Sequence, residues 1–101
     1  MDLEKRLSEL VDNFEIEEIL RLLEENKIHV KDVEKVIKQK IQRLNDMFDN
    51  NKISIYTLNS QYAKLNAIEK AVNENFVDFT ISGKTVTKPR EEWLYYKGYR
   101  A

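Results

Sequence analysis

Hydrophobic residues recur at intervals of three and four through the middle of the chain, a pattern typical of amphipathic helices. One stripe spans residues 30–48 and a second spans residues 55–72. They consist of Val30, Val33, Ile37, Ile41, Leu44 and Phe48, and of Ile55, Leu58, Tyr62, Leu65, Ile68 and Val72. Each stripe predicts a helix of about 20 residues, which is roughly 30 Å long.

The segment before these stripes is less regular. Two short stripes lie out of phase with each other: Leu3, Leu7, Leu10 and Phe14, and then Ile16, Ile19, Leu20 and Leu23. Either one helix is kinked near Asp12–Asn13, or Asp12 and Glu15 form a capping box that starts a second helix. We expect one bent helix over residues 3–25, because that length matches the two helices that follow.

A short sequence occurs twice, as NKIHVKDV at residues 26–33 and as NKISIYTL at residues 51–58. In both copies an asparagine follows the last apolar residues of a helix, and asparagine tolerates the left-handed conformation that ends many helices. In the second copy Ser54 is expected to cap the next helix. Two copies are too few for a solenoid. We interpret the repeat as one turn used twice, which predicts three antiparallel helices.

The pattern changes after Phe76. Val77, Phe79 and Ile81 alternate with polar residues, Ser82–Gly83 offers a turn, and β-branched residues follow over 84–88. This predicts a β-hairpin. Two strands alone are marginally stable, so the side carrying Phe79 and Val86 is expected to pack on the helices or on a partner.

Pro89 suits the first position of a helix, which predicts a short helix over residues 89–97. The predicted fold is therefore mostly α: an antiparallel three-helix bundle, a small C-terminal β-hairpin and a short aromatic helix. The bundle takes residues 1–76, and residues 77–101 pack on it within a single domain.

The composition agrees with a small helical protein. The chain has 101 residues, 35% of them charged and 42% hydrophobic, with two glycines and one proline. The absence of cysteine excludes disulfides and thiolate chemistry. No apolar run approaches the roughly 20 residues of a membrane span, and the first residues do not resemble a secretion signal. We expect a cytoplasmic protein without a membrane partner.

Charge is distributed unevenly along the chain. Residues 1–26 contain nine Asp or Glu against three Lys or Arg, a net charge of −6, whereas residues 27–52 have a net charge of +3. An acidic segment beside a basic one favours their packing as antiparallel neighbours.

Six of the ten aromatic residues lie after residue 75, and four of them fall in the last nine residues. These four, with a neighbouring arginine, are candidate partner-binding residues, since Tyr, Trp and Arg are enriched at the energetic centres of interfaces. The candidates are Trp93, Tyr95, Tyr96, Tyr99 and Arg100. Alternatively, the segment folds back as a lid with its tryptophan in the core.

Basic residues form a row on the helix expected at residues 30–48, and others lie in and after the hairpin. As phosphate-contacting residues they define a candidate nucleic-acid surface, whose affinity would fall steeply with salt. The candidates are Lys31, Lys35, Lys38, Lys84, Lys88 and Arg90. Alternatively, the row is a solvated face that the acidic first segment partly neutralises.

Catalytic chemistry finds little support in the sequence. The one histidine, His29, has Glu25 and Asp32 nearby, a set that suits weak metal binding or a simple helix cap. There is no glycine-rich phosphate loop, nucleophile elbow or metal-binding helix motif. We therefore predict no enzymatic activity, no cofactor and no metal site.

Two functions remain. The first is a non-catalytic protein-interaction or oligomerisation module that docks through its C-terminal hairpin and aromatic tail on a protein partner or a second copy, as a homodimer. The second rests on residues 53–88, which resemble the recognition helix and wing of winged-helix regulators. That resemblance implies a small nucleic-acid-binding regulator using helix 55–75 and hairpin 77–88. The preceding helix is longer than in that family, and no glycine separates helix from strand.

Overall fold

The computed structural model describes residues 2–91 and is mostly helical, with a small antiparallel hairpin at its C-terminal end. The chain order is four helices followed by two strands. Their bounds are α1 Leu3–Asp12, α2 Ile16–Glu24, α3 Val30–Asp49, α4 Ile55–Asn75, β1 Phe76–Ile81 and β2 Lys84–Pro89. The two long helices and the hairpin therefore lie where the sequence pattern predicts them.

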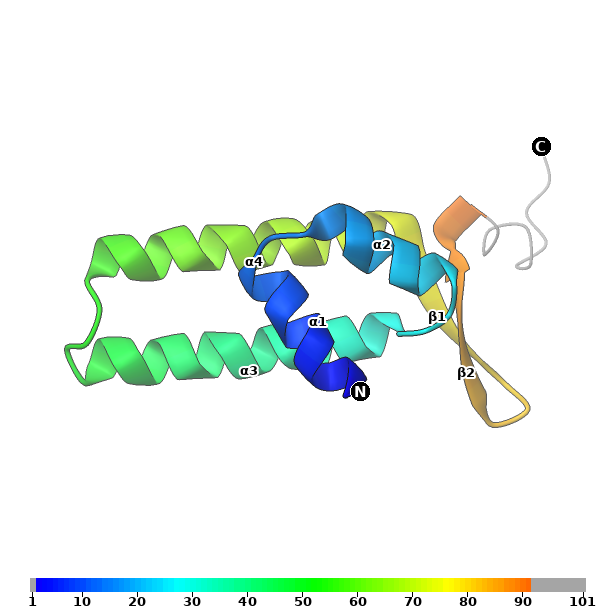
Figure 1. Cartoon of the computed structure of the whole chain (residues 1–101), viewed down its shortest axis with the longest axis horizontal. Coiled ribbons are helices and arrows are strands. Elements are labelled where there is room, and N and C mark those ends of the chain that lie inside the picture. Colours follow the sequence, from blue (N-terminus) through cyan, green and yellow to red (C-terminus); the bar gives the residue numbers. More distant parts are fainter. Residues whose placement is uncertain (1, 92–101) are drawn as a thin grey trace.

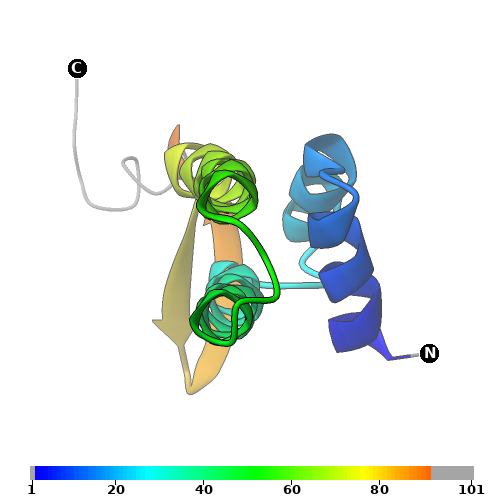
Figure 2. The same cartoon turned by 90° about the vertical axis from the view of Figure 1, so that its left-hand side faces the viewer.

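The helices form two layers of unequal length. α3 and α4 lie side by side and antiparallel in one layer, and α1 and α2 make the second layer (Figure 2). With ten and nine residues, α1 and α2 are half as long as their neighbours. They lie over the part of the α3–α4 pair next to the hairpin, whereas the end with the α3–α4 turn projects beyond them (Figure 1).

The repeated turn is confirmed as one design used twice. Asn26 and Asn51 both have positive φ, at 57° and 58°. In each copy the next N–H, from Lys27 or Lys52, bonds back to the carbonyl five residues earlier, at 3.0 and 2.8 Å. This is the Schellman motif, which satisfies the last carbonyls of a helix. In the second copy Ser54 then caps α4 as expected, accepting from the Thr57 N–H at 3.1 Å.

The same motif occurs a third time, at the end of α1. Phe14 has a φ of 56°, and the Glu15 N–H bonds to the Leu10 carbonyl at 2.9 Å. The first segment is therefore two helices with a reversal between them, and the expected single bent helix over residues 3–25 is wrong. The break falls where the hydrophobic stripes change phase, but Glu15 caps α2 without a side-chain hydrogen bond. The described residues thus contain four helices instead of the expected three.

The hydrophobic core lies between the two layers, close to the hairpin. Five of its side chains are at most 1% exposed: Ile19 and Leu23 from α2, Val33 and Ile37 from α3, and Ile68 from α4. Burying a side chain of this kind contributes roughly 1.5–3 kcal/mol. The α1–α2 layer is therefore held on the long helices by apolar packing.

The hairpin has the turn that the sequence indicates. Ser82 and Gly83 have φ values of 52° and 79°, as a two-residue type I′ turn requires. Pro89 is the last residue of β2, opposite Phe76, and helical residues begin one position later than expected, at Arg90 and Glu91. Proline is tolerated at a strand end, where its missing N–H breaks no ladder bond. Beyond residue 91, the aromatic helix expected over 89–97 lies outside the described residues.

Candidate functional site

A strand residue caps the start of α3. The carboxylate of Asp78, in β1, accepts hydrogen bonds from the N–H groups of Val30 and Lys31, both at 3.0 Å. These N–H groups have no partner within the helix, and the helix dipole favours a negative charge beside them. Asp32 adds a local bond by accepting from the His29 N–H at 2.9 Å. The hairpin and α3 are therefore joined by charge-assisted hydrogen bonds.

Thr87, in β2, adds further hydrogen bonds between the hairpin and the start of α3. We call the set formed by Asn26, His29, Asp78 and Thr87 the hairpin anchor. The Asn26 side chain bonds to the Thr87 backbone in both directions, donating at 3.0 Å and accepting at 2.8 Å. The Thr87 hydroxyl donates to Asp78 at 2.7 Å and lies 2.8 Å from Nδ1 of His29. Because the single hydroxyl hydrogen points at Asp78, the imidazole must donate through Nδ1–H. Thr87 is only 1% exposed, so its hydroxyl is a structural group and not an accessible nucleophile.

The hairpin anchor determines which face of the hairpin lies toward α3. Asp78 and Thr87 are opposite each other and share one face, so Phe79 and Val86, one position along, share the other face. The face toward the start of α3 is therefore the polar one. The free N–H groups of the helix explain this choice, because only a hydrogen-bond acceptor can satisfy them. Phe79 and Val86, both half-buried, lie on the opposite face, and its packing on the helices or on a partner stays a prediction.

The candidate phosphate-contacting residues divide into two groups. Lys31 donates to the Thr85 hydroxyl at 2.9 Å, which places the hairpin turn with exposed Lys84 beside the start of the lysine row. Lys35 and Lys38 continue this row, exposed on α3.

The other two candidates lie away from the row, in and beyond β2. Arg90 follows β2 and donates to the Asn73 carbonyl at 2.8 Å, near the end of α4. Lys88 is half-buried in β2. The structure therefore brings four of the six basic candidates together and leaves Lys88 and Arg90 elsewhere.

Two further expectations concern the C-terminal part. The five partner-binding candidates lie outside the described residues: Trp93, Tyr95, Tyr96, Tyr99 and Arg100. A helix-turn-helix sets its two helices at about 90–120°. α3 and α4 are instead antiparallel along their length (Figure 1). The described geometry therefore lacks the crossing that a winged-helix reading motif uses.

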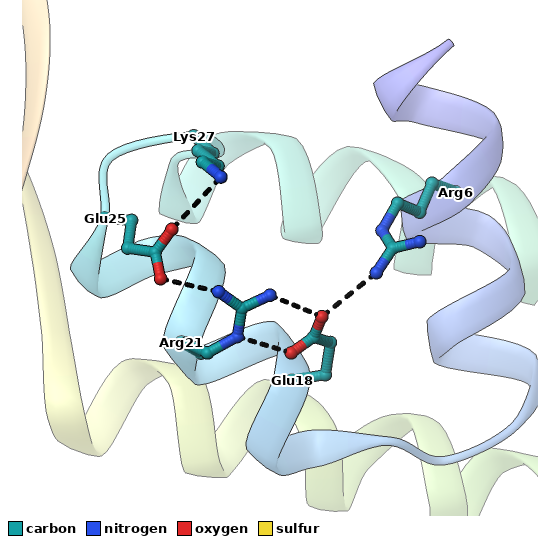
Figure 3. Close-up of polar contacts among 5 residues, drawn as sticks. All are labelled: Arg6, Glu18, Arg21, Glu25 and Lys27. Atoms are coloured by element: carbon teal, nitrogen blue, oxygen red, sulfur yellow. Dashed lines mark hydrogen bonds and ion pairs between the residues drawn. The ribbon is translucent and has the colours of Figure 1, made fainter. Parts of the chain in front are cut away.

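A chain of ion pairs links α1 to α2 (Figure 3). Arg6 of α1 bonds to Glu18 at 3.0 Å, and Arg21 grips the same carboxylate with two nitrogens, at 2.6 and 2.7 Å. Arg21 also bonds to Glu25 at 2.6 Å, and Lys27 lies 3.2 Å from that carboxylate. The chain spans the Phe14 reversal and helps to fix the angle between the two short helices.

The ion pairs shift three pKa values. The bond from Arg21, with a smaller contribution from Arg6, lowers the pKa of Glu18 from 4.5 to about 2, although burial opposes this. The bonds of Arg21 to Glu18 and then to Glu25 raise the pKa of Arg21 above its usual value. Lys27 and then Arg21 lower the pKa of Glu25. These groups are partly exposed, so the network is a set of surface ion pairs that joins α1 to α2.

A groove opens where the α1–α2 layer stops short of the α3–α4 turn. It has a volume of about 390 Å³ and lies between the end of α1 and the faces of α3 and α4. Five apolar side chains line it: Val11, Val36, Leu44, Met47 and Leu65. Leu44 and Met47 are only half-buried, so the apolar face of the long helices continues into the groove without a covering helix.

The groove walls are basic. Lys40 donates to Ser8 at 2.8 Å and forms an ion pair with Asp12, also at 2.8 Å, which marks the place where α1 ends over α3. Arg43 on α3 and Lys64 on α4 also line the groove and are exposed. Between residues 2 and 91, neither has a side-chain hydrogen bond or ion pair. The groove thus combines an apolar floor with two uncompensated cations, one on each long helix.

Comparison with family models, curated proteins and solved structures finds no match to this chain. From residue 2 to residue 91, no helix combines the length and apolar character needed to cross a membrane. Over the same range, no three His, Asp or Glu side chains are grouped to hold a metal ion.

Proposed function

We propose that this protein is a non-catalytic interaction module that binds a helix of another protein in the groove beside the α3–α4 turn. The observation that carries the proposal is the half-length second layer. α1 and α2 cover the apolar face of α3 and α4 near the hairpin and leave the rest, where Leu44 and Met47 are only half-buried, without a covering helix. An amphipathic helix laid into a hydrophobic groove is a common mode of peptide recognition.

The dimensions of the open face fit such a ligand. α3 continues for nine residues beyond Lys40, which is roughly 14 Å of helix. A docked helix of about three turns would continue the α1–α2 layer over this length and cover the half-buried side chains. Completing a second layer is how helical proteins normally bury an amphipathic face.

A library of displayed helical peptides, selected against the full chain, tests this proposal. Enriched peptides are expected to bind the wild type and Gln42→Glu alike but Met47→Glu at least about tenfold more weakly, because a charge in the apolar floor is poorly solvated. Gln42 is the matched control, since it lies on α3 outside the groove. Circular dichroism is used to check that both variants keep their helices. The proposal fails if no peptide enriches or if Met47→Glu binds as well as the control.

The C-terminal segment is a second proposed docking surface. Its support is the rigid base from which it starts: Arg90 is bonded to the Asn73 carbonyl, and Thr87 to the α2–α3 turn. The residues that follow include one tryptophan and three tyrosines. A chain ending at residue 91 is then expected to lose self-association or partner binding, measured by light scattering, while its helix content stays constant. Unfolding of this truncated chain would mean that the segment is core.

The nucleic-acid alternative remains a prediction. The exposed lysines of the α3 row and Lys84 are the residues that support it. If it holds, Lys35→Glu with Lys84→Glu should strongly reduce binding of duplex DNA at about 50 mM salt. No binding by the wild type at that salt concentration would exclude it.

A further inference from the structure

The residues that line the groove also indicate the chemistry of the helix that we propose it binds. This inference rests on the proposed function and specifies the partner. The two long helices contribute one cation each, Arg43 and Lys64, which line the groove and have no ion-pair partner among residues 2–91. The third basic group, Lys40, is already neutralised by Asp12. The free charge of the groove is therefore positive on both walls.

Charge argues against a second copy of the chain as the occupant. If two copies paired symmetrically through this face, the same patch would meet itself, as in every two-fold interface. Arg43 and Lys64 of one copy would then lie opposite the same cations of the other, and like charges across an interface oppose binding. A ligand with carboxylates on both flanks has no such conflict.

The apolar floor also argues against nucleic acid as the ligand of this groove. Phosphate binding needs cations, but it makes no use of the half-buried side chains of Leu44 and Met47. The lysine row with Lys31, Lys35 and Lys38 does not line this groove; it lines a neighbouring hollow on α3, which shares only Gln39 with the groove. The ligand that matches both features of the groove is amphipathic and acidic.

We propose that the groove binds an acidic amphipathic helix of a protein partner, with apolar residues spaced by three and four and with Asp or Glu on both flanks of that stripe. The apolar stripe covers Leu44 and Met47. The flanking carboxylates pair with Arg43 on one wall and Lys64 on the other.

Three synthetic helical peptides of about 14 residues test this pairing. They share one apolar stripe and carry Glu, Gln or Lys at the flanking positions. Binding to the full chain is measured by fluorescence anisotropy at about 50 and 150 mM salt. The Glu peptide is expected to bind about tenfold more tightly than the Gln peptide at the lower salt, with a smaller difference at the higher one, because salt screens exposed ion pairs.

Charge-reversal variants locate the effect. Arg43→Glu combined with Lys64→Glu should weaken binding of the Glu peptide about tenfold or more. The matched control is Lys38→Glu with Lys70→Glu, which makes the same charge change on the same helices outside the groove; it should change the affinity by no more than about twofold. Equal loss in both pairs would show attraction by net charge alone and overturn the proposed pairing.

The remaining outcomes separate the two proposals. If the Gln or Lys peptide binds as tightly as the Glu peptide, and Met47→Glu abolishes that binding, the groove binds helices but the acidic partner is wrong. If none of the peptides binds and the displayed library yields no ligand, both proposals fail. A wild-type dimer in light scattering that Met47→Glu converts to a monomer would identify a second copy as the occupant and overturn the acidic partner.

Discussion

The two ends of the α3–α4 pair carry the same turn in opposite surroundings. At the end near the hairpin, the turn at residues 26–29 is held by groups from elsewhere in the chain. The Asn26 side chain bonds to Thr87 in β2, and Asp78 in β1 caps α3. The turn at this end therefore binds the hairpin through hydrogen bonds.

At the other end, the turn at residues 51–54 is held by local hydrogen bonds. Ser54 caps α4 from within the turn. The nearby apolar side chains remain exposed, with Phe48 at 36%, Ile55 at 46% and Tyr56 at 83%. One local sequence thus produces one local geometry, but later parts of the chain decide whether that geometry is covered. The uncovered end is the one we propose for binding.

The largest contrast is expected from apolar truncation at the two ends. Ile68→Ala removes a fully buried side chain beneath the α1–α2 layer and should lower the free energy of unfolding by about 2–5 kcal/mol. Ile55→Ala, beside the open turn, should lower it by less than about 1 kcal/mol, since Ile55 is already largely hydrated. Urea denaturation gives both values. Similar losses would mean that the turn end is buried in solution.

The two asparagines permit a closer comparison. Glycine accepts the positive φ that both positions require. Asn26→Gly leaves the buried N–H and C=O of Thr87 without their partners and should destabilise the protein by about 2–4 kcal/mol. Asn51→Gly should change stability by less than about 0.5 kcal/mol. Thermal denaturation measures the loss of stability in each variant. Equal losses would show that the bonds between Asn26 and Thr87 add no stability.

The smallest effect concerns the ion pairs that brace α1 against α2. Because the folded pKa of Glu18 is about 2 instead of 4.5, its carboxylate stabilises the folded state above pH 4.5, and this stabilisation disappears as the pH falls toward 2. The difference in Tm between the wild type and Glu18→Gln should therefore be constant near neutral pH and shrink below 4.5. High salt should reduce the difference. A difference that grows on acidification would contradict this account.

Local signals in the sequence predict much of the fold. Periodicity predicts α3 and α4, the asparagines predict two of the three reversals, and Ser82–Gly83 predicts the hairpin turn. The third reversal was missed because Phe14 is not a residue type associated with the left-handed conformation. Its signal is the phase change between the stripes, which marks a break but not the reversal that separates α1 from α2.

The tertiary features could not be predicted in the same way. Asp78 caps a helix that begins 48 residues earlier, so no spacing rule connects the two. The groove likewise depends on where α1 ends over α3. The Lys40–Asp12 ion pair lies at that point, but no hydrophobic stripe in the sequence predicts it. The sequence shows where the basic residues are but not what they contact. Lys31 and Arg90 form hydrogen bonds within the protein, which their spacing does not predict.

The central claim is that the open half of the α3–α4 face binds a helix. The most direct test is a titration of the isotopically labelled full chain with the acidic helical peptide, followed by backbone amide chemical shifts. The claim predicts that the largest shifts cluster at Val11, Leu44, Met47 and Leu65, while Asp78 and Thr87 stay unchanged. Shifts confined to the hairpin or to the lysine row, with the four groove residues unmoved, would contradict it.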